Sequence, residues 1–218
     1  MAAAREAPGR QAPLNPPYWT RACRELGARD EVLRDIIRAH CGQTLASRGD
    51  AFGTLARSIV GQQISVKAAA SVWARLEAAL GEVAPDAVAG ATVIRLQRCG
   101  LSGRKVEYLQ GLARGFADGS LQPGQWPALE DEALIRELTR IRGIGRWSAE
   151  MYLIFHMQRP DVLPLADLGL QRAMRLHYQG KRQISLRRMQ AIAGRWRPWR
   201  TVATWYLWRS LDPVAVEY

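Results

Sequence analysis

Hydrophobic positions recur at intervals of three and four residues along most of the chain, which is the spacing of helices that bury one face. The stretch 18–41 shows this pattern and predicts one or two helices, with apolar positions at Leu26, Val32, Leu33, Ile36 and Ile37. No stretch alternates apolar and polar residues as a half-buried strand does. The pattern therefore predicts an all-α fold of about ten helices.

Polar residues that can cap a helix precede several of the periodic segments, because their side-chain oxygens can accept a bond from a first-turn N–H group. These predicted caps are Asp50, Ser65, Thr92, Ser102 and Asp167. Further helices are predicted at 129–140, 147–157, 185–195 and 201–211. Proline and glycine mark 84–90 as a loop and 119–127 as a turn-rich connection.

A turn with two glycines separates the predicted helices 129–140 and 147–157, and it lies within Ile141-Arg-Gly-Ile-Gly-Arg-Trp-Ser148. Gly143 and Gly145 permit positive φ and let a ligand approach the backbone closely. The following helix presents free N–H groups and a positive field. Flanking arginines at 142 and 146 add charge, so the turn is a candidate phosphate site. The alternative is an ordinary tight turn between packed helices.

Asp167 stands at the start of the predicted helix 168–178. The simplest interpretation is an N-cap and nothing more. Capping is compatible with chemistry, however, because a carboxylate at a helix N-terminus stays ionised and a fixed anion can stabilise a developing cation.

Composition adds a candidate partner and a candidate pocket. A net charge of +11 over 218 residues favours an anionic polymer such as DNA, although a solvated basic surface is the alternative. Eight tryptophans are many for this length. Most of them should pack in the core, but one or two could stack on a flat base. Trp147 follows the glycine turn, and Met151 lies one helical turn later on the same face.

The sequence also excludes several classes. Three well-separated cysteines indicate reduced thiols, and without a C-x-x-C pair neither a zinc knuckle nor an iron–sulfur cluster is predicted. The chain contains no run of 18 apolar residues, so no membrane span is predicted. Residues 1–17 have no apolar core like that of a secretory signal and are predicted to be a flexible leader. We therefore expect a cytoplasmic, nucleoid-associated protein that is not secreted.

Taken together, these motifs resemble the helix-hairpin-helix superfamily of DNA glycosylases, and within it the DNA-3-methyladenine glycosylase II group. The resemblance covers about residues 18–212. It rests on the glycine turn with Asp167, on Phe52–Lys67 with its Gly-Gln-Gln sequence, and on Pro164–Gln171. It implies two helical lobes around a cleft for DNA and base. One lobe is 50–159, with the hairpin, and the other combines 18–49 with 160–218.

The resemblance further implies a role for each matching residue. Asp167 matches the catalytic aspartate, and Gln63 matches a wedge that fills the gap left by an extruded base. The implied base pocket consists of Trp147, Met151 and Trp208. The implied DNA-binding residues are Gln63, Arg142, Gly143, Gly145, Arg146 and Ser148, with a monovalent cation bridging at the backbone of Gly143 and Gly145. Trp147 occupies the position of the Schiff-base lysine of bifunctional members, which implies hydrolysis without strand cleavage.

The sequence thus predicts a monomeric, cofactor-free DNA glycosylase that removes alkylated purines such as 3-methyladenine from duplex DNA. One alternative is a non-catalytic helix-hairpin-helix module, which would need the charge and the hairpin but not Asp167. Another is a glycosylase for deaminated or oxidised bases. Neutral leaving groups usually require protonation, and the sequence offers no obvious acid. No ranking among base substrates follows from the sequence.

Overall fold

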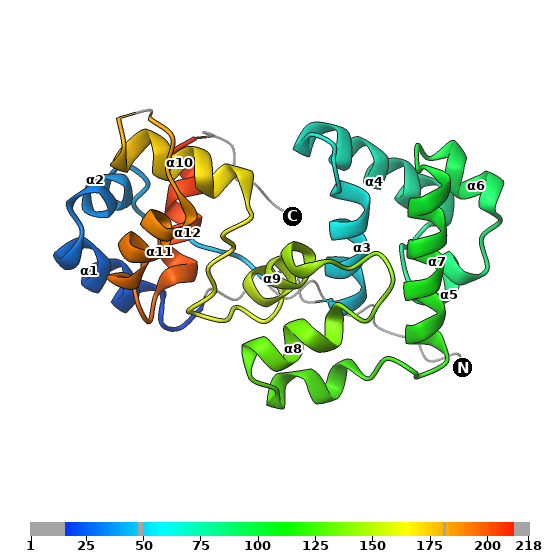
Figure 1. Ribbon diagram of the computed structural model, residues 1–218. Coiled ribbons are helices and arrows are strands. Elements are labelled where there is room, and N and C mark those ends of the chain that lie inside the picture. The colour runs from blue at the N-terminus through cyan, green and yellow to red at the C-terminus, as the bar shows by residue number, and fades with distance from the viewer. Residues whose placement is uncertain (1–15, 48–49, 181, 212–218) are drawn as a thin grey trace, which may run out of the picture.

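The structure is a computed structural model that describes residues 16–47, 50–180 and 182–211 (Figure 1). Every regular element within these residues is a helix, so the predicted all-α class is confirmed. In chain order the helices are α1 (Trp19–Arg29), α2 (Glu31–Ala39), α3 (Ala51–Gly61), α4 (Val66–Leu80), α5 (Pro85–Ala89), α6 (Val93–Arg98), α7 (Gly103–Ala117), the 3₁₀ helix η1 (Pro123–Ala128), α8 (Asp131–Leu138), α9 (Arg146–Phe155), α10 (Leu168–Tyr178), α11 (Leu186–Gly194) and α12 (Arg200–Arg209).

The five predicted caps are confirmed. Each side chain accepts a bond from a backbone N–H group two or three residues later, and the capped helices are α3, α4, α6, α7 and α10. Local capping chemistry is therefore sufficient to set the starts of these helices.

Two predictions about loops were wrong. The stretch 84–90 contains α5, in which Pro85 supplies a preset φ at the first turn and Val88 is fully buried. The connection 119–127 contains most of η1, in which Trp126 is buried. In both places proline starts a short helix that a buried apolar side chain anchors, so proline and glycine alone were misleading.

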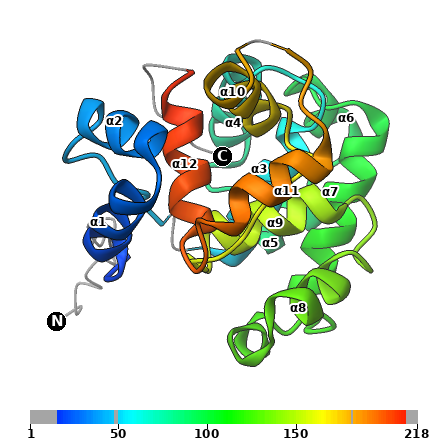
Figure 2. The same cartoon turned by 60° about the vertical axis from the view of Figure 1, so that its left-hand side comes forward.

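The helices form two groups joined through α9 (Figure 1). Contacts link α1, α2, α10 and α12 in one group, and α3 with α4 and α7 in the other. Figure 2 shows α12 beside α1 and α2, with α10 on its other side. α9 packs on α3 and α8, and Figure 1 shows it near the middle of the molecule. The two segments that flank α9, the glycine turn before it and the linker to α10 after it, are thereby placed between the groups.

Buried hydrophobic side chains from both groups belong to one connected cluster. The exact lobe boundaries at 49/50 and 159/160 stay a prediction. The predicted leader falls almost entirely on residues 1–15, which lie outside the described part of the chain, as do residues 212–218. Among the described residues, no helix is long and apolar enough to cross a membrane.

Candidate active site

Asp167 is a buried carboxylate surrounded by N–H donors. The residue is only 5% exposed and lies at the N-terminus of α10. Oδ1 accepts from the backbone N–H of Leu170 at 2.6 Å and from Nε1 of Trp208 at 2.7 Å. Oδ2 accepts from Nε1 of Trp147 at 2.9 Å. Three donors therefore fix the orientation of the carboxylate and disperse its charge.

These donors come from three different helices. Trp147 lies in the first turn of α9, directly after the glycine turn, and Trp208 lies near the end of α12. The Trp208 ring stacks on Phe155 with centroids 5.9 Å apart and planes 9° apart, so its N–H is held in direction. A Cβ atom added to Gly169 would lie 3.2 Å from Cδ1 of Trp208. The missing side chain at Gly169 thus permits the close approach of the indole to Asp167.

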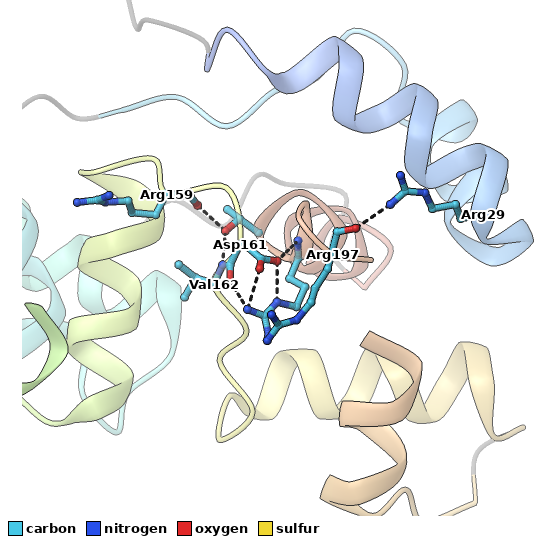
Figure 3. Close-up of polar contacts among 7 residues, drawn as sticks. Arg29, Arg159, Asp161, Val162 and Arg197 are labelled. Carbon is cyan, nitrogen blue, oxygen red and sulfur yellow. Dashed lines mark hydrogen bonds and ion pairs between the residues drawn. The ribbon is translucent and has the colours of Figure 1, made fainter. Parts of the chain in front are cut away.

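The linker between α9 and α10 is fastened to the start of α12, and this fixes the backbone that leads to Asp167. The Thr201 hydroxyl donates to the carbonyl of Arg159 at 2.6 Å and accepts from the N–H of Val162 at 3.0 Å. Figure 3 shows Asp161 and Val162 within this network. Arg200 pairs with Asp161 at 2.7 Å, and Arg29 donates to the carbonyl of Arg197 at 2.7 Å.

Asp167 and Trp147 line a cavity of about 780 Å³ that is large enough for a nucleotide. The opposite wall belongs to α3, α4 and the link between them. The lining residues are Arg57, Val60, Gly61, Gln62, Gln63, Ile64, Val66, Ala69, Ala70, Trp73, Trp147, Ala166, Asp167, Leu168 and Gly169. On this wall the Arg57 guanidinium lies 3.8 Å from the centre of the Trp73 ring. The cavity is therefore mainly apolar, with one carboxylate and one guanidinium as its ionisable groups.

Of the three residues predicted to form the base pocket, only Trp147 lines the cavity. Trp208 is buried, and its indole N–H donates to the Asp167 carboxylate. Met151 is 1% exposed and does not line this cavity, so its role in a base pocket stays a prediction. The physical reason is that α9 is buried on all sides from Ser148 to Phe155, and helical spacing alone does not say which face meets the cavity.

The two glycines of the hairpin differ from each other. Gly143 has a φ of +93°, and a Cβ atom there would lie 2.6 Å from Cδ2 of Tyr108. Gly145 has a φ of −92° and caps α9, and nothing lies within 4 Å of a Cβ atom built on it. Both glycines permit positive φ, and only Gly143 adopts it. Gly145 instead leaves open space above the first N–H groups of α9, where an anion could approach.

The predicted cationic residues of the hairpin carry carboxylate partners. Arg142 is exposed and pairs with Glu107, and Arg146 pairs with Glu132 and, at 3.0 Å, with Glu150. Both guanidinium groups can still reach solvent, with side chains 74% and 57% exposed.

Ser148, also predicted to bind DNA, is 2% exposed, and its hydroxyl lies 3.5 Å from Nε2 of Gln62. Its side chain is inside the fold, so a role in DNA binding stays a prediction. Any contact of Ser148 with DNA would have to use its backbone.

Gln63 is exposed at the rim of the cavity, as a wedge residue would be, and its φ is +59°. Its neighbour Gln62 donates from Nε2 to the carbonyl of Gly143 at 2.8 Å. Lys105 donates to the carbonyls of Val60 and Gln62 at 2.7 and 2.8 Å. Sequence reasoning missed Gln62 and Lys105, because both act through contacts between residues more than 40 positions apart.

A monovalent cation at the hairpin stays a prediction. The Gly143 carbonyl accepts from Gln62, and the Gly145 carbonyl accepts from the N–H of Ala149 at 3.0 Å. Because a carbonyl oxygen has two lone pairs, each retains one that could coordinate a cation.

Glu150 is a second buried carboxyl near the site. Burial raises its pKa to about 7, and the attraction of Arg146 opposes this rise. Glu150 lines a separate, smaller cavity of about 480 Å³ that also contains Asp161 and Arg200. It is therefore a buried acid behind the hairpin and not a lining residue of the larger cavity.

Comparisons with known proteins agree with this geometry. The family described as HhH-GPD superfamily base excision DNA repair protein matches residues 56–198. DNA-3-methyladenine glycosylase 1 of Schizosaccharomyces pombe is 34% identical over 165 residues, which are 72% of this chain and 70% of that protein. A DNA-3-methyladenine glycosylase of Bacillus subtilis is 28% identical over 199 residues, or 86% of this chain and 66% of its own length.

A solved structure of similar fold is the S. pombe 3-methyladenine DNA glycosylase in complex with abasic DNA. It superposes with a TM-score of 0.81 at 27% sequence identity, covering 91% of this chain and 99% of that one.

Proposed function

Because the chain belongs to the HhH-GPD superfamily of base excision DNA repair proteins, we propose that it is a monofunctional DNA glycosylase. It hydrolyses the N-glycosidic bond of alkylated purines of the 3-methyladenine type in duplex DNA. Relatives that carry the name DNA-3-methyladenine glycosylase support this substrate class. The observation that carries the proposal is the Asp167 carboxylate, which faces the large cavity while three N–H donors hold it.

The chemistry follows from the charge of the substrate. An alkylated purine such as 3-methyladenine carries positive charge in DNA, so its bond to C1′ breaks with the electron pair leaving on the base. The sugar then develops oxocarbenium character, and the anionic Asp167 stabilises it. Water adds its oxygen to C1′ and releases a proton, which yields a free neutral base and an abasic site. The damaged nucleotide must first leave the base stack, with Gln63 filling its place.

The cavity supports hydrolysis in preference to strand cleavage. Among its lining residues there is no lysine that could form a Schiff base with the sugar. Asp167 and Arg57 are the ionisable groups along its walls, so no general acid faces a neutral leaving group there. Removal of deaminated or oxidised bases is accordingly less well supported than removal of alkylated ones. The reaction needs no cofactor, and a cation held by the carbonyls of Gly143 and Gly145 would only help to fix a phosphate.

DNA is held, in this proposal, by the N-terminus of α9 with Arg142 and Arg146. The protein acts as a monomer on chromosomal DNA in the cytoplasm, and sedimentation with and without a short duplex tests its oligomeric state.

Gly145→Ala tests whether the N-terminus of α9 binds the DNA backbone. Its methyl group meets open space in the free protein, so stability should stay unchanged while affinity for abasic DNA falls about tenfold. Equal affinity would contradict a backbone contact at this position.

The direct test of the reaction is chromatography of bases released from duplex DNA treated with dimethyl sulfate. We expect release of 3-methyladenine and recovery of abasic strands that remain uncleaved. Duplexes containing hypoxanthine or ethenoadenine then define the substrate range. A folded protein that binds abasic DNA but releases no base would instead favour the non-catalytic module. Cleaved strands would contradict the monofunctional assignment.

A further inference from the structure

The link between α3 and α4 contains a backbone conformation that its sequence does not favour. Gln62 has φ −56° and ψ 128°, Gln63 has φ +59°, and the N–H of Ile64 approaches the carbonyl of Gly61 at 3.4 Å. These values describe a type II turn, whose third position normally takes glycine or asparagine. A glutamine there is strained, and it persists only when its surroundings impose the conformation.

Lys105 on α7 holds the turn in this conformation. Its ammonium donates to the carbonyls of Val60 and Gln62, which flank the end of α3. A positive charge at this end also complements the helix dipole. Burial lowers the pKa of the Lys105 ammonium, so holding it here has a cost that its two short bonds offset. The ammonium thus anchors the first half of the strained turn.

The same turn is attached to the hairpin. The Gln62 side chain donates to the carbonyl of Gly143, and Gly143 packs on the ring of Tyr108. Tyr108 follows Lys105 by one turn of α7, and Glu107 between them pairs with Arg142. One stretch of α7 therefore contacts both segments that face DNA in the proposed function.

We propose that Lys105 is a positioning residue for nucleotide extrusion. With Gln62, it locks the strained turn that presents Gln63 in a fixed relation to the hairpin. The hairpin can then hold the phosphate backbone at a set distance from the side chain that enters the base stack. The inference rests on the proposed function and adds to it a residue that touches neither the substrate nor the reacting atoms.

A double-mutant cycle between Lys105 and Gln63 separates this role from simple stability. Lys105→Met removes the ammonium and keeps the apolar stem, Lys105→Arg restores donors, and Gln63→Ala removes the wedge. The substrate is a duplex with a 2′-fluoro analogue of 7-methyldeoxyguanosine, which resists hydrolysis, beside 2-aminopurine. Fluorescence of the 2-aminopurine reports loss of stacking on extrusion. Single-turnover excision from the natural lesion and thermal unfolding are measured on the same proteins.

We expect Lys105→Met to reduce extrusion and excision about tenfold, and Lys105→Arg to recover most of the loss. In the Gln63→Ala background Lys105→Met should change extrusion less than twofold, because there is no wedge left to position. An equal loss in both backgrounds, or a loss that follows only the melting temperature, would overturn the inference. A wild-type protein that extrudes the analogue but excises nothing would instead contradict the proposed function and leave this cycle measurable.

Discussion

Two buried aspartates of this chain have nearly the same local design. Asp30 and Asp167 each cap a helix, and the two residues are 4% and 5% exposed. Each accepts from the backbone N–H of a leucine three residues later. Each also accepts from a tryptophan indole, Asp30 from Trp196 at 3.0 Å and Asp167 from Trp208 at 2.7 Å.

The difference lies in what surrounds the rest of the carboxylate. Asp30 also accepts from the Tyr178 hydroxyl at 3.0 Å and pairs with Arg195 at 3.4 Å. Asp167 faces the large cavity, and within the described part of the chain no cationic side chain pairs with it. An arginine counter-ion and a tyrosine hydroxyl make Asp30 a structural anion. Asp167 keeps its negative charge available for the cation that forms during the reaction.

Among variants that keep the Asp167 carboxylate, the largest effect should come from removing its indole donors. Trp147→Phe combined with Trp208→Phe keeps an aromatic ring at each position but deletes two of the three hydrogen bonds to the Asp167 carboxylate. The carboxylate therefore loses its fixed direction. We expect single-turnover excision to fall by roughly 100-fold. Trp196→Phe removes the matching donor from Asp30 and serves as the control, with an excision rate per folded molecule near that of wild type. Similar rates for all variants would contradict the role given to the indoles.

Asp30→Asn should act on stability instead. The amide leaves at least one of the donors around Asp30 without an acceptor and leaves Arg195 without its counter-ion. We expect the free energy of unfolding to fall by about 2 to 3 kcal/mol, measured by urea denaturation. The side chain of Arg195 is 56% exposed, so solvent replaces part of the lost pairing. An unchanged denaturation midpoint would show that the pair is not structural.

Glu150 is a third buried carboxyl group. It pairs with an arginine, as Asp30 does, and the negative charge of Asp167 helps to raise its pKa. Its pKa of about 7 in the folded protein exceeds its ordinary value of 4.5. The folded state therefore binds the proton more tightly, and this group's contribution to stability is lost as pH rises from 4.5 through 7. Glu150→Gln should remove that loss, on the order of 3 kcal/mol at pH 8 for a pKa raised from 4.5 to about 7. Glu132→Gln, at an exposed partner of the same arginine, should keep most of the loss between pH 4.5 and 7, because burial is the main cause of the raised pKa of Glu150 and the charge of Glu132 is a smaller one.

The smallest effect is expected for the stability of Asp167→Asn. Asparagine is also a good N-cap, and no ion pair is broken. Trp147 is only half-buried, so its indole can turn to water. We expect a melting temperature within about 2 °C of wild type or above it. A fall as large as that of Asp30→Asn would remove the contrast between the two residues.

Local signals in the sequence were enough for much of the fold. Asp167 as a cap, the glycine turn and five helix starts all depend on neighbours within a few residues. The short helices at 85–89 and 123–128 were missed, because buried Val88 and Trp126 stabilise them through contacts that no local pattern shows.

The candidate site was only partly predictable for the same reason. Trp147 and Trp208 were predicted as pocket walls, and their hydrogen bonds to Asp167 appear only when α9, α10 and α12 meet. Met151 and Ser148 lie on a helix that is buried all round, where spacing cannot select a face. Glu107 and Glu132, which pair with Arg142 and Arg146, likewise lie on α7 and α8 and not in the hairpin itself.

The most direct test of the difference between the two aspartates is their excision rate in one assay. Asp167→Asn and Asp30→Asn are mixed in excess with the same methylated duplex, at a temperature where both variants are folded, and base release is followed over a single turnover. The predicted rate for Asp167→Asn is about 1,000-fold below that of Asp30→Asn, which should stay close to wild type. Comparable rates for the two variants would contradict the assignment of the chemistry to Asp167.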